Sequence, residues 1–151
     1  MGDKELLARE IVKKHALYAA GVGLVPIPVV NMAGVAALEV KMLYDLAEHY
    51  GLPFREDRVK SIVSSLIGGV ASTNLGYGSI GLMKALPLIG PMMAIATLPL
   101  FASAITYAIG KVFIQHFESG GTFLDFEPDR VKGYFQQQFG KGKAASAAAT
   151  A

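Results

Sequence analysis

The stretch GVGLVPIPVVN, residues 21–31, decides how the first third of the chain folds. It carries no charge and places Pro26 and Pro28 one residue apart. Each proline removes a backbone N–H and disfavours the α region for its predecessor, so one straight helix through the stretch is not expected. The stretch therefore predicts a helical hairpin with Pro26 and Pro28 at its tip, between helices over residues 3–24 and about 29–50.

The apolar arms of this hairpin are short. Residues 16–25 and 29–38 contain ten residues each, so each arm rises about 15 Å, half of a hydrocarbon core of about 30 Å. Residues 16–38 hold no Asp, Glu, Lys or Arg. Three arrangements stay open, namely a re-entrant hairpin in one leaflet, a full span, and a hairpin buried in a soluble bundle.

The middle of the chain is even poorer in charge. Residues 61–110 contain one formal charge, Lys84, and the whole chain is only 17% charged, against about 25% in ordinary soluble domains. The uncharged runs 61–83 and 85–110 predict a second, membrane-spanning hairpin with Lys84 at the far surface. Because basic residues cluster in 1–15, 39–60 and 111–143, both termini are expected in the cytoplasm, at a bacterial inner membrane.

Small residues recur every fourth position in the first of these runs. Ser64, Gly68, Ser72 and Gly76 form a stripe that lets another helix approach closely, a device favoured in membranes. The stripe predicts helix packing and a homo-oligomer. A channel lined by the Ser, Thr and Asn side chains of this run is an alternative, which a single charge in 50 residues disfavours.

The C-terminal third has a different character. Gly120 and Gly121 predict a turn, residues 122–126 an extended piece, and Pro128 the start of a short amphipathic helix. The Ala/Ser-rich residues 141–151 are expected to be a disordered tail. The predicted fold is thus an all-α hydrophobic bundle of two helical hairpins plus a short C-terminal amphipathic helix, in a single domain over residues 1–140.

No motif nominates an active site. GYGSIG matches G-x-G-x-x-G at residues 76–81, but no strand precedes it and no acidic residue follows at the required distance. His15, His49 and His116 are far apart in the sequence and are expected to be solvated or interfacial rather than metal ligands. With no cysteine and a net charge of +2, we expect no catalytic residue, no cofactor, no metal and no nucleic-acid partner.

Three stretches together resemble an uncharacterised bacterial family of small, hydrophobic helical proteins. They are VPIPVVNMAGVAALEVKMLYDLAEHYG (residues 25–51), EDRVKSIVSSLIGG (56–69) and KVFIQHFESGGTFLDF (111–126). Members of that family occur alone or as the C-terminal domain behind an Era-like GTPase. The resemblance, over about residues 8–127, implies a membrane or assembly domain. Since this sequence has no P-loop, the resemblance implies either a separate GTPase that works in trans or a protein that acts alone.

The sequence therefore predicts a non-enzymatic membrane protein that contacts membrane lipid and acts as a self-associating scaffold or as the partner of a GTPase. The alternative is a soluble helical module that binds a lipid or a partner protein through an apolar surface.

Overall fold

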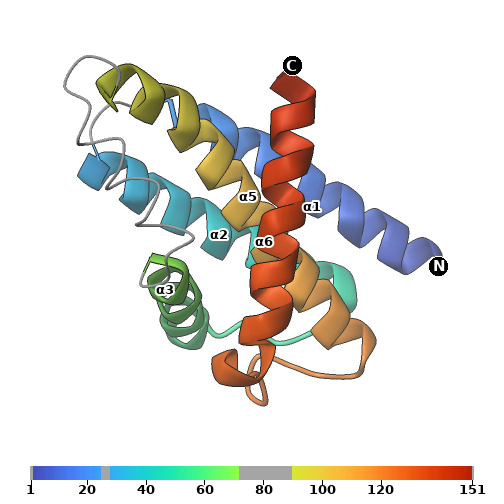
Figure 1. Cartoon of the computed structure of the whole chain (residues 1–151). Helices are drawn as coiled ribbons and strands as arrows, with labels where there is room; N and C mark the ends of the chain where they lie inside the picture. The colour runs from blue at the N-terminus through green and yellow to red at the C-terminus, as the bar shows by residue number, and fades with distance from the viewer. Residues whose placement is uncertain (1, 25–27, 72–89, 151) are drawn as a thin grey trace.

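The computed structural model describes residues 2–24, 28–71 and 90–150, and every regular element in these ranges is an α-helix (Figure 1). The helices are α1 (Asp3–Val22), α2 (Pro28–Tyr50), α3 (Glu56–Ala71), α5 (Gly90–Glu118) and α6 (Pro128–Thr150). The predicted all-α fold is confirmed. Pro26, Ser72, Gly76 and Lys84, with the middle of the predicted spanning hairpin, lie outside the described residues.

The first predicted hairpin is formed by α1 and α2, which pack antiparallel (Figure 1). Pro28 is the first residue of α2, the helical position where a missing N–H has no cost. Near this end Gly34 lies against α1, because a Cβ on Gly34 would be only 2.8 Å from Val22 Cγ1. Further along, His15 Nε2 lies 3.3 Å from Asp45 Oδ2 and connects the same two helices.

The longest helix, α5, packs antiparallel along α1 (Figure 1). The two helices approach closely at Gly110, where a Cβ would lie 2.4 Å from Val12 Cγ2. A side chain at this position would push the two helices apart, so glycine sets their separation. The pairing joins residues about 100 positions apart, and the hydrophobic pattern did not predict it.

The larger core cluster combines aliphatic side chains with deeply buried phenylalanines. The phenylalanines come from α5, the following loop and α6, namely Phe113, Phe123, Phe126, Phe135 and Phe139, each at most 2% exposed. Phe113 stacks on Phe126 with ring centroids 4.4 Å apart. Arg58 of α3 fixes the loop, since its Nε and Nη2 donate to the carbonyls of Phe123 and Phe126 at 3.2 and 2.7 Å.

Gly120 and Gly121 lie directly after α5, where the sequence places a turn. Gly120 adopts φ +87°, a left-handed conformation that glycine adopts without strain. Gly121 leaves room for His116, whose Cε1 would be 2.4 Å from a Cβ at position 121. His116 Nε2 lies 2.7 Å from the carbonyl oxygen of Thr122. The segment 122–126, expected to be extended, is an irregular loop over the aromatic core.

The last helix is longer than predicted. α6 starts at Pro128 as expected but continues to Thr150, so the structure places helix where we expected a disordered tail from residue 141. Alanine has the highest helix propensity, and the final residues are mostly alanine. Tertiary contacts also hold this part, because Gly142 packs on α5, where a Cβ would lie 3.1 Å from the Ala104 carbonyl oxygen.

Candidate membrane-contacting end

Three uncharged helix segments meet at one end of the bundle. Because α1 runs antiparallel to both α2 and α5, residues 16–24, 28–38 and 90–110 lie together (Figure 1). None of these ranges contains Asp, Glu, Lys or Arg. We refer to these three ranges as the uncharged end. A small buried cluster within it joins Ala19, Val35 and Ala102 of the three helices, while Ala104, Ile105, Ala108 and Ile109 belong to the larger core cluster.

The outward side chains of the uncharged end are apolar too. On α1, α2 and the residues after α1, the exposed positions whose side chains are described are Leu17, Tyr18, Gly21, Leu24, Ala33 and Ala37. Leu17 is 72% exposed and Leu24 is 63% exposed. Only Tyr18 among them brings a polar side-chain atom. Exposed apolar positions at one end of the bundle indicate a contact with a membrane or with another protein.

A buried carboxyl lies at the border of the uncharged end. Glu39 of α2 is fully buried, and its Oε1 accepts a hydrogen bond from Thr106 Oγ1 of α5. Its Oε2 has no hydrogen-bond partner among the described residues. Burial raises the pKa of Glu39 to about 8, against a smaller lowering by the Thr106 hydrogen bond.

Sequence reasoning missed this residue. In the sequence Glu39 begins a charged stretch that continues with Lys41, Asp45 and Glu48, but the structure places Glu39 on the buried side of α2. The sequence spacing does indicate burial of Glu39. It follows Val35 by four residues and precedes Leu46 by seven, so the three share a helix face, and both neighbours are buried.

The prediction of solvated histidines is wrong for His15. This side chain is buried at 4% exposure, and its Nδ1 lies 2.8 Å from the Ile11 carbonyl oxygen. Its Nε2 faces Asp45 on α2. His15 therefore acts as a polar link between α1 and α2 just below the uncharged end.

The described half of the predicted packing stripe faces outward on α3. Ser64 and Gly68 are exposed, and a Cβ on Gly68 would have no atom within 4 Å. No described helix packs on these two residues. The tip residue Pro28 is the first residue of α2, and its side chain lies outside the described set.

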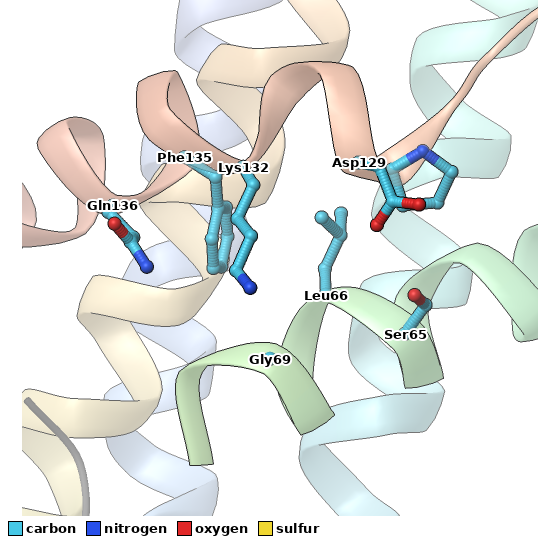
Figure 2. A pocket seen from close by; sticks show the side chains of 8 residues that line it. Ser65, Leu66, Gly69, Asp129, Lys132, Phe135 and Gln136 are labelled. Atoms are coloured by element: carbon cyan, nitrogen blue, oxygen red, sulfur yellow. The ribbon is translucent and has the colours of Figure 1, made fainter. Parts of the chain in front are cut away.

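Two surface hollows are present in the described part of the chain. Figure 2 shows the first, about 190 Å³, lined by Ser65, Leu66, Gly69, Pro128, Asp129, Lys132, Phe135 and Gln136 of α3 and α6. The second, about 290 Å³, is lined by Glu5, Arg9, Lys111, Ile114, Gln115, Glu118, Ser119 and Tyr134. Both are smaller than usual ligand sites. Neither lining contains His or Cys, and no potential metal-binding group of three or more His, Cys, Asp or Glu occurs within the described ranges.

A known protein family matches almost the whole chain. Residues 1–144 match the family model described as Domain of unknown function (DUF697). The chain belongs to the DUF697 family. This agrees with the resemblance to an uncharacterised bacterial family that the sequence stretches carry.

A curated relative of this DUF697 chain is Magnetosome membrane protein 22 of Magnetospirillum gryphiswaldense. The two are 39% identical over 145 residues, which cover 95% of this chain and 74% of the relative. No solved structure matches the DUF697 chain. Over residues 2–24, 28–71 and 90–150, no helix has both the length and the apolar character needed to cross a bilayer.

Proposed function

We propose that this chain is a non-enzymatic, membrane-associated helical domain whose uncharged end enters the lipid bilayer. The observation that carries the proposal is the apolar character of the outward positions at that end, above all Leu17 and Leu24. The name of the relative, a magnetosome membrane protein, supports a membrane location.

The dimensions and the energetics agree with partial insertion. From Lys14 to Val22, the last residue of α1, the helix rises about 12 Å, enough to reach the hydrocarbon of one leaflet. Each leucine removed from water contributes about 1.5–3 kcal/mol. Insertion would place Leu17 and Leu24 in lipid without carrying any described charge with them.

The location proposed is a bacterial inner membrane, with the charged end on the cytoplasmic side. The N-terminus lies at the charged end, since α1 begins with Asp3 and Lys4 and runs toward the uncharged end. The basic blocks of the sequence favour the cytoplasm. A spanning hairpin over residues 61–110 stays a prediction, because its middle lies outside the described residues.

Self-association and a GTPase partner are the finer parts of the proposal. The exposed Ser64 and Gly68 support self-association, because they leave an open helix face. The resemblance to domains fused to Era-like GTPases supports the partner. Pull-down of a GTPase by Gly68→Ala but not by Gly68→Leu would support both a scaffold role and the α3 face as its contact.

A single-tryptophan experiment tests membrane insertion. The natural chain has no tryptophan, so Leu17→Trp creates a unique fluorophore at the uncharged end. Leu124→Trp is a matched control, because Leu124 is similarly exposed at 62% but lies in the loop at the charged end. Both variants are made as full chains and incorporated into vesicles that contain brominated phospholipid.

Insertion predicts that tryptophan at position 17 has blue-shifted emission and is strongly quenched by brominated acyl chains, while tryptophan at position 124 is not. Equal weak quenching of both variants in vesicle-bound protein would contradict insertion by this end. The alternative is a soluble module that binds another protein. It would be favoured if the protein stayed monodisperse without binding vesicles and if a partner protein shielded the tryptophan at position 17 from quenching.

A further inference from the structure

Six lysines lie near the border of the uncharged end. They are Lys13 and Lys14 on α1, Lys41 on α2, Lys111 on α5, and Lys141 and Lys143 on α6, and we call them the lysine belt. On α1, α2 and α5 they are the first or second basic residue next to the uncharged ranges. Lysines at the border of an uncharged segment are expected in a protein that lies in a membrane interface.

The belt residues of α1 and α5 lie at one level. These two helices approach closely at Val12 and Gly110. Lys13 and Lys111 each follow one partner of that contact directly. Since one residue advances a helix by about 1.5 Å, the two lysines lie within a few ångströms of the same plane across the bundle axis.

The belt residue of α2 joins this level through Glu39. Glu39 accepts a hydrogen bond from Thr106, and Lys41 follows Glu39 by two residues. In the parallel pair of α2 and α5, Lys41 is therefore level with about residue 108, one turn or less from Lys111.

The belt also includes α6. Burial is the main cause that lowers the pKa of Lys111; the charges of Arg9 and Lys141 lower it further, and the Glu5 carboxylate raises it. Lys141 therefore lies close enough to Lys111 to act on its charge. The ammonium of Lys143 lies 5.3 Å from the centre of the Phe139 ring, an amphipathic pairing typical of interfacial positions.

Most belt charges lack a carboxylate partner. Lys13 pairs with Glu10 at 2.9 Å and Lys41 pairs with Asp45. Within the described chain, no salt bridge involves the other four belt residues, Lys14, Lys111, Lys141 and Lys143. The nearest carboxyl on the uncharged side is Glu39, which is fully buried. An anionic surface at this level would therefore contact lysine ammonium groups. The uncharged end contains no exposed carboxylate that would repel it.

From this placement we propose that the lysine belt binds the phosphate groups of anionic phospholipids. The inference rests on the proposed function, because only insertion of the uncharged end brings the belt to headgroup level. A lysine near an anionic membrane surface contributes about fivefold in affinity, so three lysines contribute on the order of 100-fold.

The test compares two lipid compositions and two triple variants. Vesicles consist of phosphatidylcholine alone or of phosphatidylcholine with phosphatidylglycerol, and binding of the full chain is titrated by flotation. The belt variant is K14Q/K111Q/K141Q. The control variant, K4Q/K60Q/K132Q, removes the same charge from three lysines outside the belt. Circular dichroism verifies that both variants keep the helical content of the parent.

The belt predicts that phosphatidylglycerol strengthens binding of the parent and of the control, while the belt variant binds both vesicles as weakly as the parent binds phosphatidylcholine. Equal binding of the parent to both vesicles would overturn the belt and leave membrane insertion standing. An equal loss of binding to phosphatidylglycerol vesicles in the two triple variants would also overturn the belt, because net charge alone would then explain the effect. Binding to neither vesicle would overturn the belt and the proposed function together.

Discussion

Glu39 Oε1 and the Ala102 carbonyl oxygen share one hydroxyl, that of Thr106, which lies 3.0 Å from the carbonyl. A hydroxyl has a single proton to donate. An ionised Glu39 would take this proton and leave the Ala102 oxygen without it. A protonated Glu39 would instead donate to Thr106 Oγ1, which reverses the bond described above and leaves the Thr106 proton for Ala102. Both bonds form only in the protonated state, which is also the state that burial favours.

Glu39→Gln is expected to change how stability depends on pH. The pKa of Glu39 is raised from 4.5 to about 8 in the folded chain, so the folded state holds a proton that the unfolded state loses. The contribution of Glu39 to the free energy of unfolding is therefore largest below pH 4.5, and it decreases as the pH rises from 4.5 to 8. Glutamine is neutral throughout, so the variant should match the parent near pH 4.5 and exceed its melting temperature at pH 8, by on the order of 10 °C.

The measurement for Glu39→Gln is thermal unfolding by circular dichroism from pH 4.5 to 9. Glu48→Gln, an exposed position on the same helix, should follow the parent at every pH. Parallel curves for the Glu39→Gln variant and the parent would show that Glu39 is ionised in the fold or is not buried as described.

Gly110→Ala should destabilise the fold by about 1–3 kcal/mol, because its Cβ would overlap Val12 and force α1 away from α5. Gly133→Ala is the matched control. It is an exposed helical glycine with no atom near its Cβ position, and the change should stabilise by about 0.5–1 kcal/mol. Val12→Ala in the Gly110→Ala background should recover part of the loss. Denaturant titration gives all three values, and additive effects of the two substitutions would argue against the contact.

Arg58→Lys should lower the free energy of unfolding by about 1–2 kcal/mol, although the positive charge is retained. The planar guanidinium donates from two nitrogens to the carbonyls of Phe123 and Phe126, and a lysine ammonium does not reproduce that fork. Arg55→Lys, at a neighbouring exposed position, should change the free energy of unfolding by less than about 0.5 kcal/mol. A similar cost for both variants would mean that the loop is not held by Arg58.

Leu17→Asp should weaken vesicle binding by at least about tenfold, because a charge would have to enter the bilayer with α1. Its cost to folding in water should be small, since Leu17 is 72% exposed. Leu124→Asp provides the comparison at the charged end and should leave vesicle binding unchanged. Flotation with increasing lipid measures both variants, and equal weakening would exclude the uncharged end as the insertion site.

The sequence by itself determined the all-α fold, the first hairpin and the segregation of charge. Pro26 and Pro28 exclude a straight helix through residues 21–31, and charge-free runs are visible without coordinates. Gly120 and Gly121 similarly predict that the helix ends after the last long apolar run. These features are local, because they depend on backbone geometry and residue type at neighbouring positions.

Only the tertiary structure decided which helices pair and which polar groups are buried. The contact of Gly110 with Val12 and the bond of Thr106 with Glu39 join distant parts of the chain, and hydrophobic periodicity carries no information on partners. The same applies to the belt, since lysines on four helices lie near one border only after antiparallel packing. The length of α6 was misjudged because a low-complexity alanine segment becomes helical once Phe139 and Gly142 anchor it on α5.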